Sequence, residues 1–132
     1  FNSANQMTND GTNTLTYDNN GNLTSDGTNT HTWDRANRLL SVGNHSYAYD
    51  GNGARIQKTV SSVATDYLLD VNQGLTQVLA ETTGVNTNHY IHSPRGIHAM
   101  NDGSNWSYML QDGLGSVRAE IGQNCRRIRR RF

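Results

Sequence analysis

The sequence of 132 residues is poor in cysteine, proline and long apolar runs. Because Cys125 is the lone cysteine, no disulfide can form within the chain, although a disulfide to another chain stays open. No stretch approaches the roughly 18 apolar residues of a membrane-spanning helix. The first residues have neither the basic start nor the apolar stretch of a signal peptide, and the missing initiator methionine favours a processed product or an excised piece. We therefore expect no membrane span.

The chain is also lean in apolar residues, which make up 33% of it. Small polar residues take their place, with 17 Asn, 14 Thr, 13 Gly and 10 Ser. These residue types favour turns, caps and extended backbone over helix interiors. Disorder would call for a large net charge as well as low hydrophobicity, and here the net charge is zero. The composition predicts an ordered all-β protein of a length that suits one domain.

Charge is distributed unevenly along the chain. Residues 1–123 hold all eleven acidic residues but only six basic ones, which gives this part a net charge of −5. Residues 124–132 form a basic tail whose five positive residues are Arg126, Arg127, Arg129, Arg130 and Arg131. Nucleic acid is a poor partner for this chain because the acidic body would repel phosphate. We expect the tail to be a disordered end or to contact an acidic surface, which makes its arginines candidate assembly contacts.

A repeat of 16 residues organises the N-terminal half. Residues 10–18 return as residues 26–34 with seven of nine positions identical, and a third copy spans residues 42–50. A glycine, an aromatic residue and an aspartate recur at this spacing. The glycines are Gly11, Gly27 and Gly43, and the aromatics are Tyr17, Trp33 and Tyr49. The aspartates that end the three copies are Asp18, Asp34 and Asp50. The first position of a copy is also an aspartate, except in the third copy, where it is Val42.

Each repeat predicts one β-hairpin. Residues 12–17 alternate in the period-2 pattern of a strand, with threonines on one face. The turns supply Asp, Asn and Gly, and Gly21 and Gly53 stand where a hairpin needs positive φ. The repeat is near exact over residues 10–58 and looser over 64–122. We predict about six hairpins in one antiparallel meander, forming a single domain over residues 1–123.

Two kinds of motif resemble the Rhs family. Residues 17–23 and 49–55 are similar to its YD repeats. The second motif is similar to the signature of the Rhs repeat-associated core, which more often has His at the second position, and consists of Asp112, Gly113, Leu114, Gly115, Ser116, Val117 and Arg118. The resemblance covers roughly residues 6–123 and implies a curved β-sheet that spirals into a hollow shell.

Rhs shells occur in polymorphic toxins, in insecticidal toxin complexes and in teneurins, and they typically enclose or present a C-terminal payload. The resemblance therefore implies a secreted, extracellular or cell-surface location. After Gln123 the family usually continues into motifs that include self-cleaving aspartates, whereas here the basic tail follows. No self-cleavage site is carried over. About six hairpins are also too few to enclose a protein cargo.

The sequence contains little that indicates a catalytic or metal site. Asp18, Asn20 and Asn22 resemble the start of a calcium loop, but position twelve of that loop would be Asn29 rather than Glu. His89 and His92 would lie on opposite faces of a strand. Around Ser116 the glycine that a nucleophile elbow needs is replaced by Arg118. We expect no enzyme, no metal and no cofactor.

The aromatic–aspartate pairs admit two interpretations. They suit the stacking of sugars, which would make the chain a carbohydrate-binding module that depends on Trp33 and Trp106. They suit structural packing better, because a ring at every turn is expected where neighbouring hairpins pack. We expect a non-enzymatic structural protein that self-assembles by strand-edge pairing into an extracellular tube or filament. The main alternative is the end segment of a toxin-encapsulating Rhs shell.

Overall fold

The predicted all-β fold is confirmed. The computed structural model describes residues 1–72, 74–94, 96–123 and 128–130, in which the only regular secondary structure is β-strand. The chain divides into two compact units, residues 1–64 and residues 65–132. We describe each unit by itself. In the residues described, there is no helix with the length and hydropathy of a membrane span.

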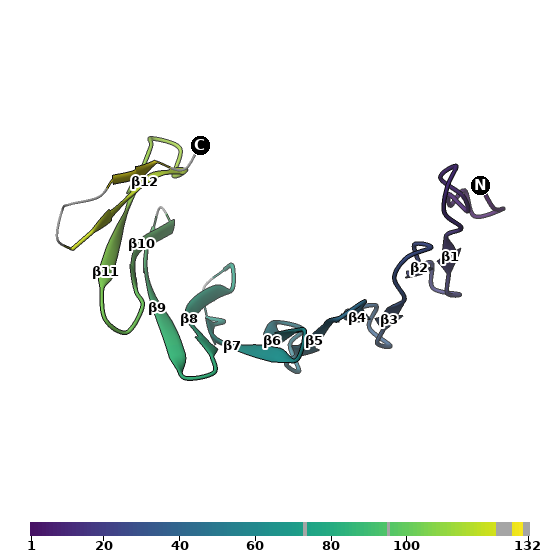
Figure 1. Ribbon diagram of the computed structural model, residues 1–132, viewed down its shortest axis with the longest axis horizontal. Helices are drawn as coiled ribbons and strands as arrows, with labels where there is room; N and C mark the ends of the chain where they lie inside the picture. The colour runs from purple at the N-terminus through teal and green to yellow at the C-terminus, as the bar shows by residue number, and fades with distance from the viewer. Residues whose placement is uncertain (73, 95, 124–127, 131–132) are drawn as a thin grey trace. The chain divides into compact units, whose positions relative to one another are not determined.

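The first unit is a meander of short strands, drawn in purple to blue in Figure 1. Antiparallel pairs join β1 to β2, β3 to β4, β4 to β5 and β5 to β6. A single bridge between Ser25 and Thr30 joins the second and third strands. The strand predicted over residues 12–17 is shorter than expected, because before β1 the chain forms only an isolated bridge, between Thr14 and Asn9. The strands are β1 (Thr16–Tyr17), β2 (Leu23–Ser25), β3 (His31–Trp33), β4 (Leu39–Val42), β5 (His45–Tyr49) and β6 (Arg55–Val60).

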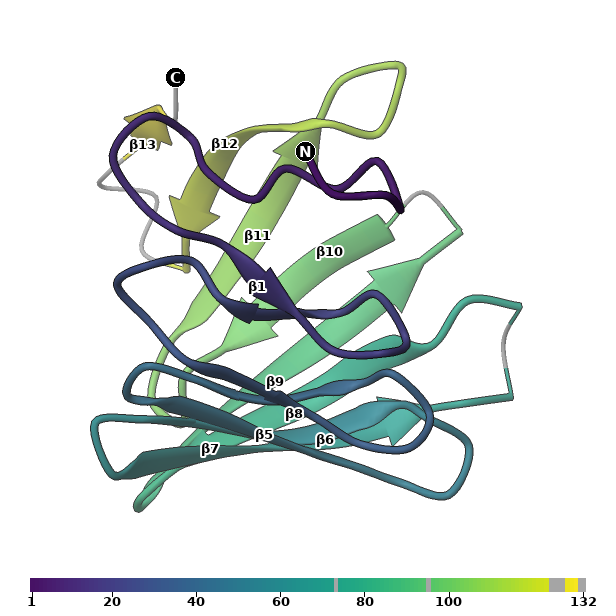
Figure 2. The ribbon, with the colours of Figure 1, turned by 90° about the vertical axis from the view of Figure 1, so that its right-hand side faces the viewer.

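The second unit has longer strands, each paired antiparallel with the next (Figure 2). Strand β7 begins two residues before the boundary of the unit. The predicted antiparallel meander is therefore confirmed in both units, whereas a single domain over residues 1–123 stays a prediction. The strands are β7 (Val63–Asp70), β8 (Gln77–Thr83), β9 (Asn86–Ser93), β10 (Gly96–Asn101), β11 (Trp106–Gln111), β12 (Val117–Gly122) and β13 (Ile128–Arg130).

Very little side-chain volume is buried. Among the described residues only Ala80 and Ala99 count as buried, and both belong to the second unit. Ala99 is 1% exposed, while its cross-strand neighbours Ile91 and Tyr108 are 46% and 43% exposed. A sheet with so small an apolar core gains little from the hydrophobic effect. Strand pairing and side-chain hydrogen bonds must therefore provide much of its stability.

Threonine and serine hydroxyls line one face of the strands, as the alternating pattern predicts. The Oγ1 atoms of Thr16 and Thr24 lie 2.8 Å apart. Thr32 and Ser41, which are directly opposite each other on β3 and β4, bring their hydroxyl oxygens to 2.6 Å. Such cross-strand hydroxyl pairs stabilise a sheet that lacks apolar cover.

Candidate functional site

The turn that follows each aromatic residue of the repeat is built around an aspartate. One carboxylate oxygen of Asp18 accepts hydrogen bonds from the main-chain N–H groups of Asn20 at 2.9 Å and Asn22 at 2.8 Å. The main chain closes the same turn, because Asp18 N donates to Asn22 O at 2.9 Å. Asp34 and Asp50 repeat the pattern, accepting from the residues two and four positions on at 2.8–2.9 Å.

The fourth residue of this turn has a left-handed backbone. Gly21 and Gly53 have φ values of 89° and 88°, in the region that glycine enters without steric cost. In the middle copy Asn37 takes the place of glycine with φ of 59°. Asparagine is one of the few other residues that tolerates this conformation. The turn therefore survives in a copy that lacks its glycine.

The core signature folds into the same turn. Asp112 accepts from the main-chain N–H groups of Leu114 at 2.9 Å and Ser116 at 3.0 Å, and Gly115 has φ of 87°. A Cβ atom added at Gly113 would meet nothing within 4 Å, so the start of a side chain can be accommodated there. Val117 begins β12, and Arg118 Nε lies 3.7 Å from the Asp112 carboxylate.

Residues 1–6 form one more copy of this turn, where the sequence indicated only a partial repeat unit at Phe1. Asn2 Oδ1 accepts from Ala4 N at 3.0 Å and from Gln6 N at 2.9 Å, and Asn5 has φ of 59°. Asn2 stands in the place of the repeated aspartate, Phe1 in that of the tyrosine and Asn5 in that of the glycine, so none of these three letters of the motif remains. The signal that could have found it is spacing, because Phe1 and Asn2 precede Tyr17 and Asp18 by the repeat length.

A second type of turn begins at an Asp-Gly pair. Asp26 Oδ1 accepts from Thr28 N at 2.8 Å and from Asn29 N at 2.6 Å, and Asp10 makes the same two contacts at 2.8 and 2.7 Å. Gly11 and Gly27 take φ of 101° and 86° in these turns. In the third copy Gly43, with φ of 54°, lies between β4 and β5, where Val42 replaces the aspartate.

The Asp-Gly turn also recurs in the second unit. Asp102 Oδ1 accepts from Ser104 N at 2.9 Å and from Asn105 N at 2.7 Å. This copy was missed because Ser104 replaces threonine and because the 16-residue spacing has been lost by that point. The four-residue pattern Asp-Gly-Ser/Thr-Asn is the signal that would have found it.

These hydrogen bonds lower the pKa values of the aspartates that accept them. Donation by Asn29 N, reinforced by Thr28 N, lowers the pKa of Asp26 to about 2. The pKa of Asp34 is lowered chiefly by the N–H of Arg38, and that of Asp18 chiefly by the side chain of Asn22. The pKa values of Asp10 and Asp102 are lowered by the N–H groups of their own turns. Each carboxylate is therefore held in its charged form by the turn.

The repeated aromatic side chains join neighbouring hairpins. Trp33 Nε1 donates to Leu23 O at 2.7 Å, and Tyr49 OH donates to Leu39 O at 2.8 Å. Tyr17 OH makes the equivalent bond to Met7 O at 2.8 Å. Every one of these bonds spans ten residues. The rings thus satisfy main-chain carbonyl groups of the preceding hairpin, which the sequence interpretation of ring packing did not foresee.

We expect Tyr49→Phe to destabilise the first unit by about 1 kcal/mol, the usual contribution of a protein hydrogen bond. The loss is the donor to Leu39 O, while the ring and its contacts remain. Tyr47→Phe is the matched control, since Tyr47 lies on the same strand and the guanidinium of Arg55 lies 5.5 Å from the centre of its ring, which phenylalanine keeps. Urea unfolding measures the difference, and an equal effect of the two changes would contradict the role of this bond.

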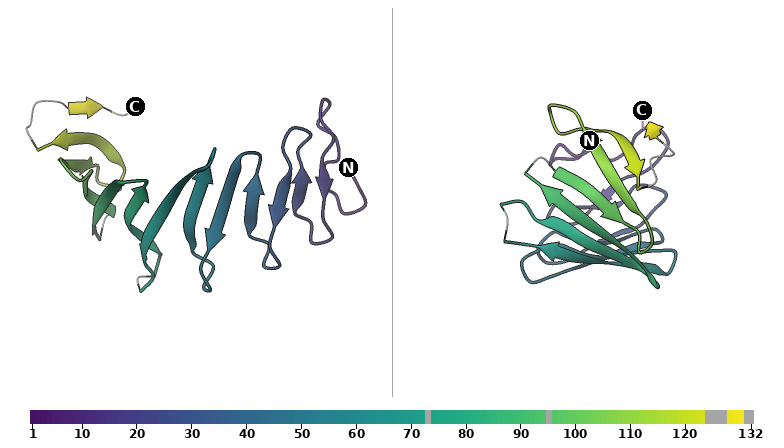
Figure 3. Two further views of the ribbon diagram at one scale, coloured as in Figure 1. Left: turned by 60° about the horizontal axis from the view of Figure 1, so that its bottom comes forward. Right: turned by 90° about the vertical axis from the view of Figure 1, so that its left-hand side faces the viewer.

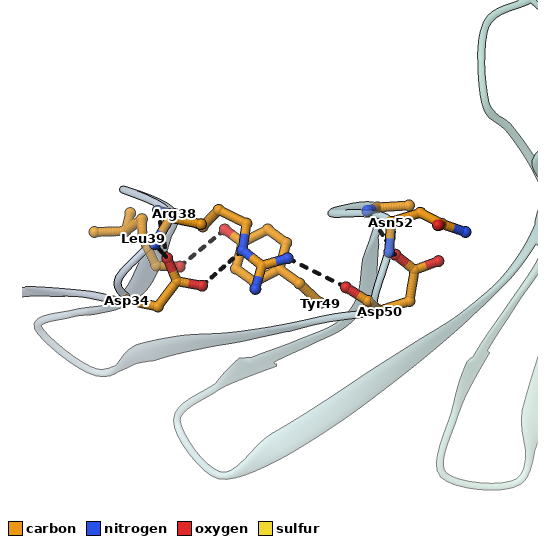
Figure 4. Close-up of polar contacts among 8 residues, drawn as sticks. Asp34, Arg38, Leu39, Tyr49, Asp50 and Asn52 are labelled. Atoms are coloured by element: carbon orange, nitrogen blue, oxygen red, sulfur yellow. Dashed lines mark hydrogen bonds and ion pairs between the residues drawn. The ribbon is translucent and has the colours of Figure 1, made fainter.

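Polar side chains also link one turn to the next at the 16-residue spacing. Gln6 Nε2 donates to Gly21 O at 3.3 Å, and Asn22 Nδ2 donates to Asn37 Oδ1 at 2.8 Å. Sixteen residues after Asn22, Arg38 takes the place of this linking side chain. Figure 4 shows how its guanidinium lies between two turns, with Nε 2.6 Å from Asp34 Oδ2 and Nη1 3.1 Å from Asp50 O.

The guanidinium of Arg38 also lies 5.1 Å from the centre of the Tyr49 ring. One side chain therefore contacts its own turn, the next turn and the next aromatic residue. Sixteen residues after Arg38 the corresponding residue is Ala54, whose methyl group cannot form such a link. The chain of turn-to-turn contacts is thus a property of residues 6–50.

Two of the residues considered as metal ligands, Asp18 and His92, have hydrogen-bond partners in the main chain. In the part of the chain that the structure describes, no group of three or more His, Cys, Asp or Glu side chains could hold a metal ion. The calcium-like oxygens of Asp18 are used within the turn, since Oδ1 accepts from two N–H groups and Oδ2 from Asn22 Nδ2 at 2.9 Å. His92 Nε2 lies 2.7 Å from Val78 O, a carbonyl that can only accept, so this nitrogen carries the proton.

The predicted assembly arginines lie largely beyond the described residues. Arg126, Arg127 and Arg131 fall outside them, as does Cys125. The main chain of Arg129 and Arg130 belongs to β13, opposite Glu120 and Ala119 of β12. Part of the tail is therefore a strand rather than a disordered end.

A scan against models of known protein families found no match, and a search of curated protein sequences found none either.

Proposed function

We propose that the chain is a non-enzymatic structural protein, a YD-repeat β-sheet subunit of Rhs type that joins further copies by strand-edge pairing in an extracellular tube or filament. The observation that carries this proposal is the set of side-chain links at the repeat spacing. Trp33 and Tyr49 reach back to the hairpin before, and Asn22 and Arg38 reach forward to the turn after. Contacts of this kind can be continued by any further hairpin of the same sequence.

The outermost strand of the first unit supports the proposal. Residues 8–10 pair with residues 13–15, because Leu15 N donates to Thr8 O at 2.9 Å and Asp10 N donates to Asn13 O at 3.2 Å. Since main-chain groups alternate in direction along a strand, the N–H and C=O of Asn9 face the other side. Unpaired groups on an edge of this kind are a template for another strand.

The aromatic side chains support a structural role as well, because the polar atoms of Tyr17, Trp33 and Tyr49 bond to the hairpin before. The bond of Trp33 weakens the carbohydrate-binding alternative at this residue, because the indole N–H that would recognise a sugar already has a partner.

The end segment of a toxin-encapsulating Rhs shell remains the second candidate. It is favoured by the Asp112 turn, because the core-like signature follows the repeat array in the order that the family has and folds into the same turn. A shell segment would pair with further repeats of its own chain rather than with other copies. The two candidates therefore differ in whether the isolated chain assembles.

Electron microscopy of the purified protein near neutral pH tests the proposal. We expect ordered tubes or filaments that weaken in high salt, because salt screens the attraction between the acidic body and the basic tail. A monodisperse monomer at all protein concentrations would overturn self-assembly and favour the shell segment.

A proline at the edge makes the test specific. Asn9→Pro removes the outward N–H of the edge strand, which we expect to abolish assembly. Asn9→Ala is the matched control, because it also removes the side-chain contact with Gly11 N at 2.7 Å but keeps the main-chain N–H. Assembly that survives in both variants would exclude this edge as the joining surface.

A further inference from the structure

A pocket of about 500 Å³ opens on one face of β8, β9 and β10 in the second unit. The register explains why its side chains meet. Ile97 lies directly opposite His92, and Tyr90 lies two residues before His92 on the same face of β9. Glu81 lies opposite Asn88, which shares the face of Tyr90. Figure 3 shows these strands side by side in the green part of the ribbon.

One wall of the pocket is apolar. It is formed by Val78 and Ile97 from the strands and by Leu75, which precedes β8. Leu75 is 84% exposed, although it is a large aliphatic residue. Exposed apolar side chains gathered around a concavity are typical of binding sites.

The polar end of the pocket is a carboxylate in a fixed position. Glu81 Oε1 accepts hydrogen bonds from Tyr90 OH at 2.7 Å and from Asn88 Nδ2 at 3.1 Å. Burial and the neighbouring carboxylate raise the pKa of Tyr90, so its phenol stays protonated and remains a donor. Both bonds go to one oxygen, Oε1, and Glu81 is among the residues that line the pocket.

The charge of this part of the chain favours a cation. Residues 65–123 contain six acidic residues and two arginines, Arg95 and Arg118. Arg118 is on β12, away from the strands that form the pocket, whereas Arg95 directly precedes the lining residue Gly96 in the sequence. A carboxylate beside apolar walls fits a ligand with an aliphatic stem and a positively charged end, because such side chains bury the stem and pair the charge.

We propose that this pocket binds a basic side chain, arginine or lysine, of a polypeptide. The aliphatic stem lies along Leu75, Val78 and Ile97, and the cationic nitrogen donates to Glu81. This role is separate from strand-edge assembly, which uses the main chain of the first unit.

Isothermal titration of the wild-type protein with N-acetyl-arginine amide tests the proposal, with N-acetyl-citrulline amide as the neutral probe of nearly equal shape. We expect saturable binding of the arginine probe at least about tenfold tighter than that of the citrulline probe, the range of a charge-assisted hydrogen bond. Equal binding of the two probes, or none of either, would overturn the proposal without any variant.

Two substitutions locate the site. Glu81→Gln keeps an oxygen that can accept from Tyr90 and Asn88 but removes the charge, and we expect it to abolish the preference for arginine. Glu120→Gln removes a charge from β12 and is the matched control, for which the preference should persist. A preference that survives Glu81→Gln, or that is lost equally in Glu120→Gln, would place the cation elsewhere and overturn the assignment.

Discussion

Gly27→Ala should destabilise the first unit by about 2–4 kcal/mol, the sum of a backbone and a steric cost. Gly27 has φ of 86°, a conformation that costs alanine about 1–2 kcal/mol. A methyl group at this position would also lie 2.5 Å from Cβ of Asn13, in the turn one repeat earlier. Because that neighbour is the first carbon of a side chain held in its own turn, relief requires the two turns to separate.

The first repeat supplies the control for this substitution. Gly11 occupies the same place in an identical Asp-Gly-Thr-Asn turn with φ of 101°, but a methyl group there would meet nothing within 4 Å. Gly11→Ala should therefore show the backbone cost alone, about 1–2 kcal/mol. Urea unfolding followed by tryptophan fluorescence, in a Trp106→Phe background in which Trp33 is the only tryptophan, measures both variants. Equal losses would mean that the turns are not in contact.

A second substitution separates the steric cost of the contact with Asn13 from the backbone cost at position 27. Asn13→Gly removes the carbon that an alanine at position 27 would strike, at the cost of the hydrogen bond from Asn13 Nδ2 to Asp10 Oδ2. In a double-mutant cycle with Gly27→Ala, the two changes should therefore be less harmful together than the sum of each alone. Strict additivity would contradict a direct contact between the turns.

The turns are the part of this structure that the sequence predicts best, and the reason is that their determinants are local. An aspartate and the N–H groups that it binds lie within four residues, so the pattern around Asp18 is sufficient to infer the turn. The same logic failed for residues 1–6, where the letters changed but the geometry did not. Asn2 replaces the carboxylate with an amide oxygen that accepts the same two bonds.

Contacts between hairpins could not be derived in the same way. The bond from Tyr49 to Leu39 depends on the register of β4 and β5 and on the irregularity between Ala48 and Tyr49. The pocket of the second unit is harder still, because Glu81 and Tyr90 lie on different strands, beyond the exact repeat. No local pattern places a carboxylate beside a phenol when the register that joins them is unknown.

The first unit should lose stability as the pH falls, chiefly between about pH 4 and pH 2. Asp10, Asp18, Asp26 and Asp34 all have folded-state pKa values below the ordinary 3.8, and that of Asp26 is about 2. The unfolded chain therefore binds more protons than the folded one in this range. The stabilisation that these aspartates provide is fully present above their unfolded-state pKa, and it is lost as the pH falls through their folded-state pKa values.

Asp26→Asn isolates one of these contributions. Asparagine can still accept from Thr28 N and Asn29 N, but it carries no charge and cannot titrate. We expect the variant to be less stable than the wild type at pH 7 and the difference to narrow between pH 4 and pH 2, as the aspartate becomes neutral. Urea unfolding at pH 7, 4 and 2 provides the comparison. A difference that stays constant with pH would show that the turn depends on the shape of the side chain and not on its charge. In that case the amide in the Asn2 turn would serve as well as the carboxylates in the later copies.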